Sequence, residues 1–236
     1  MNDVLDTAVR FGAGLLPPRT LCLTFDDGPG ATLGLGRGPR TLDLAEYLAE
    51  QGIEATFFMC GKHIEQHPDV PRQVLDLGHT VGNHTYEHRL LPSLSDDEVR
   101  YEIRSTRELL ARLGVSGAIP FRAPWGEWDD RIAAAVSADT EIVESHSAVY
   151  GWDIDAEDWE CWDKQRSAQH CADAYLALAK EHDSGVVLMH DSTADPGLPG
   201  ERMRAGNLSL DAVRLLVPML RAEGFTFLPL SAVDPA

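Results

Sequence analysis

The strongest constraint on the fold of this chain is the alternation of short apolar runs with longer amphipathic runs along most of its length. The strand-like runs are 21–25, 55–59, 80–81, 119–121, 142–149, 186–189 and 225–228, and the helix-like runs are 42–50, 70–77, 96–113, 129–137, 168–181 and 208–221. This alternation predicts βαβ units around a parallel sheet. Seven or eight such units in 236 residues, without a Pro-rich linker, predict one α/β domain of barrel type.

Several of the predicted helices carry end signals. Ser95, with Glu98 three residues later, forms a capping box in which the hydroxyl satisfies a free amide of the first turn. Gly78, Gly114 and Gly224 follow helical runs, where glycine can adopt the left-handed conformation that ends a helix. The helix ends are therefore better marked than the strands.

Charge and hydropathy narrow the range of partners and compartments. Asp and Glu number 38 against 20 Lys and Arg, which gives a formal net charge of −18. Such a chain repels phosphate backbones, so no nucleic acid partner is expected. No run approaches the length of a membrane span, so membrane insertion is not expected either. No signal peptide is visible in residues 1–16, so we expect a cytoplasmic protein or a secreted one with its signal removed. We also expect a monomer.

The cysteines do not indicate a disulfide scaffold or a metal site. They are Cys22, Cys60, Cys161 and Cys171, without close pairing. Cys22 and Cys60 lie in apolar strand-like runs, so we expect buried free thiols without a catalytic role.

Polar residues of catalytic type follow almost every predicted strand. These residues are Asp26, Asp27, His84, His88, Arg122, Asp155, Asp158, His190 and Asp191. A barrel brings the carboxyl ends of its strands to one face, so we expect these side chains to converge there. Strand ends are often polar, but that tendency explains one or two clusters and not five. This face is the predicted active site.

Two histidines and a carboxylate in this set are donors of the kind found in catalytic metal sites. His84 and His88 are four residues apart, so on a helical turn they would share a face and point at one ion. Asp26 and Asp27 are adjacent, so on a strand one could ligate the metal while the other faces its water. The alternative interpretation of Asp-Asp-Gly-Pro is a simple turn. Two histidines and one carboxylate leave coordination positions open, which suits catalysis.

Five motifs in order resemble the polysaccharide deacetylases, carbohydrate esterase family four, which includes chitin, peptidoglycan and nodulation-oligosaccharide deacetylases. They are Thr24-Phe25-Asp26-Asp27-Gly28-Pro29, His84-Thr85-Tyr86-Glu87-His88, Arg122-Ala123-Pro124-Trp125, Asp155-Ala156-Glu157-Asp158-Trp159 and Leu188-Met189-His190-Asp191. The resemblance implies a single distorted (β/α)7-8 barrel, with one catalytic domain over 1–236 and an N-terminal extension over 1–19. It also implies hydrolysis of N-acetyl groups from N-acetylglucosamine-containing saccharides of chitin or peptidoglycan type.

The resemblance further implies a base and a metal site. Asp26 would be the general base, paired with Arg122, which keeps the carboxylate oriented. The implied metal ligands are Asp27, His84 and His88. Zn²⁺ is the expected ion, although Co²⁺, Ni²⁺ or Mn²⁺ also suit these donors.

The same resemblance implies an acid and a substrate pocket. His190 would protonate the departing amine, with Asp158 favouring its charged form. The backbone amide of Trp125 would help to stabilise the oxyanion. Trp159 and Leu188 would line an apolar pocket for the acetyl methyl group.

Several assignments stay open at this level. Trp128, Trp152 and Trp162 could line a sugar groove or pack in the core. Structural positions are expected for the remaining histidines, which are His63, His67, His79, His146, His170 and His182. Asp155 and Asp191 are expected only to support loops, and the segments 30–40 and 159–169 to shape substrate choice.

The substrate also stays open, because one site can serve several reactions. An O-acetyl esterase of acetylxylan type or a small-molecule amide hydrolase would use the same residues. A saccharide-binding domain without activity is a third interpretation. The presence of base, acid and ligands together argues against it.

Overall fold

The first long apolar run forms strand β2 (Thr20–Gly28), and every residue of this strand is buried. It pairs in parallel with β3 (Thr56–Met59) on one side and with β8 (Gly185–His190) on the other. A strand enclosed in this way requires a near-continuous apolar sequence, and 21–25 supplies it. The computed structural model describes residues 5–31, 40–194 and 206–234.

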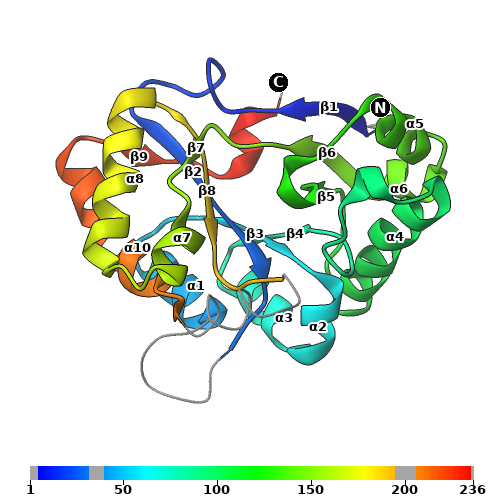
Figure 1. Ribbon diagram of the computed structural model, residues 1–236, viewed down its shortest axis with the longest axis horizontal. Coiled ribbons are helices and arrows are strands. Elements are labelled where there is room, and N and C mark those ends of the chain that lie inside the picture. The colour runs from blue at the N-terminus through cyan, green and yellow to red at the C-terminus, as the bar shows by residue number, and fades with distance from the viewer. Residues whose placement is uncertain (1–4, 32–39, 195–205, 235–236) are drawn as a thin grey trace.

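The described strands form one parallel sheet in the order β1-β6-β5-β4-β3-β2-β8-β7, and β9 pairs with the start of β2. The remaining strands are β1 (Asp6–Arg10), β4 (Thr80–Asn83), β5 (Ile119–Phe121), β6 (His146–Tyr150), β7 (Ile154–Asp155) and β9 (Thr226–Phe227). Within the described residues β1 and β7 end the order without pairing to each other, so the barrel is open. The expected α/β fold, a distorted barrel, is confirmed as a half-barrel of parallel strands (Figure 1).

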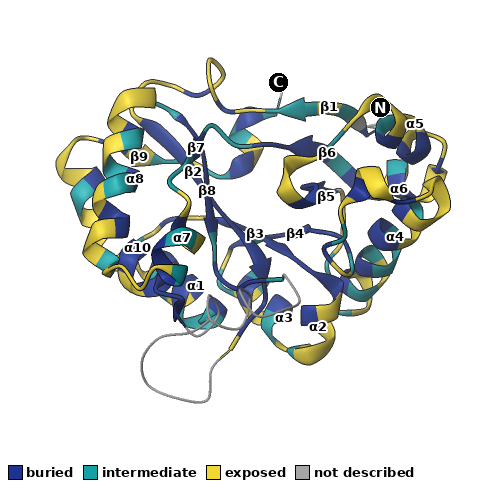
Figure 2. Ribbon diagram, in the orientation of Figure 1, coloured by how far each residue is buried: buried dark blue, intermediate teal, exposed yellow. Residues whose placement is uncertain are grey.

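Helices cover the outside of the sheet, with α8 and α10 packed together at one end and α4, α5 and α6 at the other (Figure 1). Their bounds are α1 (Thr41–Glu50), α2 (Gly61–Gln66), α3 (Val70–Asp76), α4 (Asp96–Arg112), α5 (Asp130–Ser137), α6 (Thr140–Ser145), α7 (Asp158–Asp163), α8 (Ala168–His182) and α10 (Ser209–Ala222), with 3-10 turns η1 (Leu91–Ser93), η2 (Pro124–Gly126) and η3 (Leu230–Val233). Each long helix turns a buried face to the strands and an exposed face to solvent (Figure 2). The core therefore lies between helices and sheet.

The largest departure from the sequence prediction concerns the apolar run 142–149. Its first part belongs to α6, which begins where the Asp139 side chain accepts the Ile142 amide, and only His146–Tyr150 is strand. An apolar run of this length does not distinguish helix from strand, and the capping aspartate decides. Strand β1 was not expected, and it places part of the 1–19 extension in the sheet beside β6. The short helices α2 and α7 were not expected either.

The expectations for the helix-ending glycines and for the cysteines hold. Gly78, Gly114 and Gly224 have φ values of 89°, 87° and 85°, as left-handed helix ends require. All four cysteines are buried and free. In the described parts of the chain, no helix combines the length and apolar character needed to cross a bilayer. Of the segment 30–40, residues 32–39 lie outside the described residues.

We expect Ser95→Ala to lower the free energy of unfolding by about 1 kcal/mol, because the predicted capping box is formed. The Ser95 hydroxyl accepts the Glu98 amide, and the Glu98 carboxylate accepts the Ser95 amide at 2.9 Å. Chemical denaturation measures the change. Ser105→Ala makes the same substitution in the middle of α4 and should leave stability within a few tenths of a kcal/mol, about the difference in helix propensity. Equal effects of the two variants would contradict the capping role.

Candidate active site

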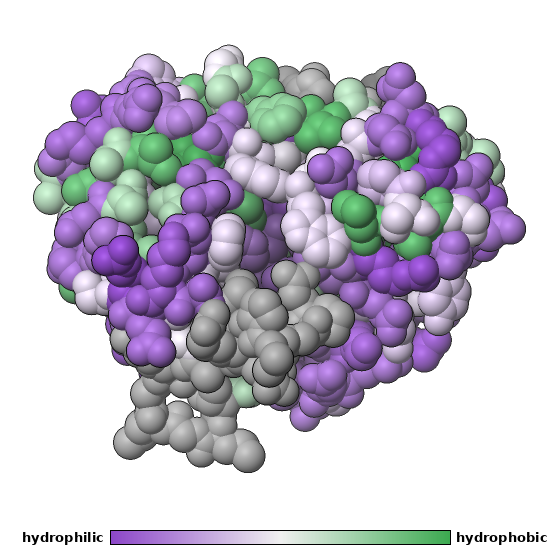
Figure 3. All heavy atoms as spheres, viewed as in Figure 1, coloured by the Kyte–Doolittle hydropathy of each residue, from purple (hydrophilic) through white to green (hydrophobic). Residues whose placement is uncertain are grey.

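The polar residues predicted from the strand ends meet at one cavity of about 520 Å³. Its wall includes Asp26, Asp27, His84, His88, Trp125, Asp155, Trp159, Leu188 and His190. Arg122 and Asp158 are completely buried behind this wall, where they contact Asp26 and His190. The surface is hollowed near the centre of the face seen in Figure 3. The predicted convergence of the strand ends is therefore observed.

The two aspartates face the same cavity, although adjacent residues of a regular strand point to opposite sides. The register between β2 and β3 shifts between Asp26 and Gly28, and Asp27 has a φ of 72°. Such a bulge turns a side chain that would otherwise point away. The assumption of a regular strand at this pair is therefore wrong, but both carboxylates reach the cavity where one could ligate a metal while the other faces its water.

A buried ion pair orients Asp26. Arg122 donates from Nη1 to Asp26 Oδ1 at 2.8 Å and to Thr24 Oγ1 at 2.7 Å. Its other nitrogens reach the carbonyl oxygens of Tyr150 and Gly151 at 3.2 and 2.9 Å. A buried guanidinium requires this many acceptors, and here they also fix its position. Because Arg122 occupies Oδ1, Oδ2 is the oxygen of Asp26 that remains for a ligand.

The segment from His84 to His88 is a loop and not the helical turn that the spacing suggested. Thr85 and His88 have φ values of 66° and 56°, which non-glycine residues rarely adopt. Two buried side chains hold this conformation. Asn83 Oδ1 accepts the Thr85 amide at 2.9 Å, and Glu102 Oε2 accepts the amides of Tyr86 and Glu87 at 2.9 and 2.8 Å. The histidines therefore converge through loop hydrogen bonds from β4 and α4.

Asp27, His84 and His88 present one oxygen and two nitrogens that lie within 4.8 Å of one another, and all three residues are buried. Asp27 Oδ1 is 3.5 Å from His84 Nε2 and 3.3 Å from His88 Nε2. The carbonyl of Arg122 lies 2.8 Å from His84 Nδ1 and can only accept, so Nδ1 carries the proton and Nε2 keeps its lone pair.

Two further properties suit this group to a cation. Asp27 Oδ1 is buried without a hydrogen-bond donor in the described chain, while Oδ2 accepts the Ala194 amide at 3.0 Å. Burial raises the pKa of Asp27, but His88, His190 and His84 outweigh burial and hold the pKa below its usual value. Burial also lowers the pKa of His84, which favours the neutral imidazole that binds metals. The residues present therefore fit a divalent metal ion.

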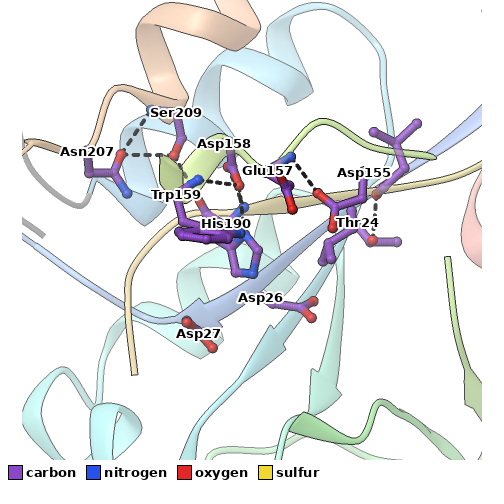
Figure 4. Close-up of polar contacts among 12 residues, drawn as sticks. Thr24, Asp26, Asp27, Asp155, Glu157, Asp158, Trp159, His190, Asn207 and Ser209 are labelled. Carbon is purple, nitrogen blue, oxygen red and sulfur yellow. Dashed lines mark hydrogen bonds and ion pairs between the residues drawn. The ribbon is translucent and has the colours of Figure 1, made fainter. Parts of the chain in front are cut away.

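His190 is held by both oxygens of Asp158, as Figure 4 shows. Its Nδ1 is 2.7 Å from Oδ1, and its backbone amide donates to Oδ2 at 2.8 Å. Burial lowers the pKa of His190, but Asp158, Asp27 and Asp26 outweigh burial and raise the pKa to about 10. A bound cation beside Asp27 would oppose this rise. Since Nδ1 faces Asp158, Nε2 is the nitrogen available to a substrate.

Several residues that support the site carry little sequence signal. His63 donates to the Asp27 carbonyl at 2.6 Å, and Ser209 binds the His190 carbonyl at 2.5 Å while Asn207 holds Ser209 (Figure 4). Asp155 accepts the Glu157 amide at 2.7 Å ahead of α7, a loop contact of the expected kind.

The structure also places the tryptophans and the aspartate whose roles the sequence left open. Trp152 and Trp162 line the cavity, whereas Trp128 does not. Ser192 and Thr193 also line it; their only sequence signal is their position just after the His190 motif. Asp191 is buried and contacts Thr41 at the start of α1, which ties β8 to that helix.

Comparison with known proteins agrees with this architecture. The sequence profile described as polysaccharide deacetylase matches residues 14–143. A chitooligosaccharide deacetylase of Azorhizobium caulinodans is 30% identical over 213 residues, which are 89% of this chain and 92% of the relative. A peptidoglycan-N-acetylglucosamine deacetylase of Bacillus cereus is 30% identical over 214 residues, covering 90% of this chain and 67% of the relative.

Solved structures show the same fold. A crystal structure of a peptidoglycan N-acetylglucosamine deacetylase superposes with a TM-score of 0.74 and 27% identity, covering 96% of this chain and 92% of the other. The chitin deacetylase of Colletotrichum lindemuthianum has a TM-score of 0.73 at 24% identity, covering 99% of this chain and 93% of the other. The chain belongs to the polysaccharide deacetylase family.

Proposed function

We propose that this chain hydrolyses N-acetyl groups of N-acetylglucosamine-containing saccharides, of chitin or peptidoglycan type, in a metal-dependent reaction. The observation that carries the proposal is the meeting of three units at one cavity. These are the Asp27–His84–His88 group, the Asp26–Arg122 pair and the His190–Asp158 pair. The names of the two relatives, a chitooligosaccharide deacetylase and a peptidoglycan-N-acetylglucosamine deacetylase, support the substrate class.

Asp27, His84 and His88 would hold the metal, with Zn²⁺ as the proposed ion and Co²⁺, Ni²⁺ or Mn²⁺ as ions that suit the same donors. When bound, such an ion supplies a Lewis acid that polarises a carbonyl and lowers the pKa of water. His84 stays oriented through its Nδ1 contact with the Arg122 carbonyl. An oriented neutral imidazole binds a metal more tightly than a freely rotating one.

Asp26 acts as the general base. Its Oδ1 is held by Arg122 at 2.8 Å, so Oδ2 accepts the proton of the attacking water. The guanidinium is fully buried and balances the negative charge of the buried Asp26 carboxylate.

His190 acts as the general acid. Asp158 accepts from Nδ1, so the proton on Nε2 passes to the departing nitrogen. An amine leaves poorly unless it is protonated, so a positioned histidinium supplies what amide hydrolysis requires. Trp125, Trp159 and Leu188 all border the cavity. The backbone amide of Trp125 stabilises the oxyanion, and the side chains of Trp159 and Leu188 contact the acetyl methyl group.

Substitution of the two aspartates should separate catalysis from metal binding. Asp26→Asn should reduce acetate release from N-acetylglucosamine oligomers about a hundredfold to ten-thousandfold while metal stays bound. Asp27→Ala should lose metal and activity together. Metal content by elemental analysis and acetate release by coupled assay give the two readouts. Normal turnover of Asp26→Asn would show that Asp26 is not the base. Release from acetylated xylan but not from the oligomers would favour the esterase.

Asp158→Asn should move the alkaline limb of the kcat/KM profile to lower pH. His190 acts protonated, so activity falls as pH rises through its pKa. Burial alone lowers that pKa and Asp158 raises it, so loss of the carboxylate lowers it by about one unit or more. Glu160→Gln removes a charge from the same helix without contacting His190 and is the matched control. An unmoved limb in Asp158→Asn would contradict the assignment of His190 as the acid.

Glu102→Ala should weaken metal binding about tenfold to a hundredfold, because Glu102 holds the amides of Tyr86 and Glu87 in the loop that carries both histidines. Calorimetric titration of metal-free protein with Zn²⁺ measures the affinity. Glu102→Gln keeps an acceptor oxygen at the same place and should retain most of the wild-type Zn²⁺ affinity. Wild-type affinity in Glu102→Ala would show that β4 alone orients the histidines.

A further inference from the structure

A buried amide and a buried imidazole meet behind the loop 84–88. Asn83 is the last residue of β4 and His146 the first of β6, and Asn83 Nδ2 lies 3.0 Å from His146 Nε2. We propose that His146 is a positioning residue for the Asp27–His84–His88 group, and that it acts through Asn83 on the loop that carries both histidines. The inference rests on the proposed function for the metal that this group would hold.

The Asn83 side chain joins this loop to the helix-covered side of the sheet. Nδ2 donates to the Ile103 carbonyl of α4 at 2.8 Å and to His146 at 3.0 Å, and Oδ1 accepts the Thr85 amide at 2.9 Å. Asn83 thus faces α4, while the adjacent His84 faces the cavity. Thr85 has a φ of 66°, which a non-glycine residue keeps only when neighbouring contacts hold it. The amide of Asn83 is therefore anchored on α4 and β6 and fixes the start of the loop.

The contacts of Nδ1 decide the tautomer of His146. Nδ1 lies 2.9 Å from the Ile142 carbonyl, which can only accept. The Ser145 hydroxyl, 3.1 Å from Nδ1, already donates to the Glu141 carbonyl at 2.6 Å and can likewise only accept. Nδ1 therefore carries the proton, and Nε2 keeps the lone pair that faces the Asn83 amide. Burial lowers the pKa of His146 to about 4, so the ring is neutral near neutral pH and Nε2 stays an acceptor.

Helix α6 fixes His146 in turn. His146 ends this helix, and its backbone amide as well as Nδ1 reaches the Ile142 carbonyl. The start of α6 is held by Asp139, whose side chain accepts the Ile142 amide at 3.2 Å and pairs with Arg104 of α4. Strand β5 lies between β4 and β6, and the Phe121 ring of β5 packs edge-on against the imidazole at 6.1 Å (Figure 1). The contacts thus run without a break from α6 through His146 to the loop.

The polarity of this pair is what a positioning role requires. Asn83 and His146 are 0% and 1% exposed, and burial of polar groups is unfavourable unless each is hydrogen-bonded. Apolar side chains would fill the same space without that penalty, but they would supply no acceptor for the Thr85 amide and no support for that acceptor. Residues that hold metal ligands in place typically change metal affinity about tenfold to a hundredfold when they are removed.

The test uses substitutions of His146 that differ in reach. His146→Gln places an amide oxygen near the position of Nε2, where it can accept from Asn83, whereas the side chain of His146→Asn is one methylene shorter and ends beside the Ile142 carbonyl. Calorimetric titration of metal-free protein with Zn²⁺ measures the affinity, and the visible absorption of the Co²⁺ form reports the geometry of the ligands. We expect His146→Asn to weaken Zn²⁺ binding about tenfold and to shift the Co²⁺ bands. His146→Gln should stay within about threefold of the wild-type affinity.

His79→Asn is the matched control, because it removes another buried neutral histidine. His79 is 4% exposed, and its ring nitrogens lie 2.8 Å from the Ala45 carbonyl and 3.2 Å from the Ala55 amide. These partners belong to α1 and to the residue before β3, away from the loop 84–88. Both Asn variants should lower the free energy of unfolding in chemical denaturation, but only His146→Asn should weaken Zn²⁺ binding. His146→Phe keeps the ring volume and replaces His146→Asn if that variant does not fold, with the same loss expected.

Hydrogen exchange of the backbone amides of 84–88 gives a readout that requires no metal. In metal-free protein, His146→Asn should speed exchange in this loop relative to His146→Gln and His79→Asn. Equal Zn²⁺ affinities of the two His146 variants, or equal losses in His146→Asn and His79→Asn, would overturn the positioning role. Failure of wild type to bind Zn²⁺ or Co²⁺ would instead count against the proposed function, and hydrogen exchange would then decide whether His146 positions the loop.

Discussion

The parallel pairing of β2 with β8 is the contact on which the site depends. Its register places Asp26 opposite His190, so a carboxylate and an imidazole on strands far apart in sequence end at the same edge. Pairing of β2 with β3 on the other side, followed by β4, brings His84 to that edge as well. Parallel strands expose all their carboxyl ends on one side, so a slip of one residue would turn these side chains away from each other.

Burial of several charges at this edge requires compensation. Asp26, Asp27 and Asp158 are all buried, and each would be destabilising alone in a low-dielectric environment. Arg122 compensates Asp26 and His190 compensates Asp158, with hydrogen bonds of 2.8 and 2.7 Å. Among the described residues, Asp27 contacts His84, His88 and the Ala194 amide but no Lys or Arg side chain. A divalent cation at this group would complete the charge balance of the site.

Strained backbone is concentrated around the same cavity. Asp27, Thr85, His88, Trp125 and Glu157 all have positive φ values, and each such residue costs about 1–3 kcal/mol. Neighbouring side chains hold several of them in place, including His63 behind Asp27 and Glu102 behind the histidine loop. The rigid sheet and α4 thus supply the stability that keeps the ligand atoms together.

The sequence by itself determined the α/β class, most helices and strands, and the polar residues that meet at the cavity, because periodicity and strand-end position are local properties. It did not determine the bulge at Asp27 or the loop conformation of 84–88, since both depend on contacts with distant residues. It also did not predict helix α6, because an apolar run of that length suits helix and strand equally. The supporting roles of His63, Glu102 and Ser209 cannot be inferred from the sequence alone either, because their partners are distant in sequence. Only the tertiary structure joined His146 to Asn83, because the order of β4, β5 and β6 in the sheet decides which strand ends lie near each other.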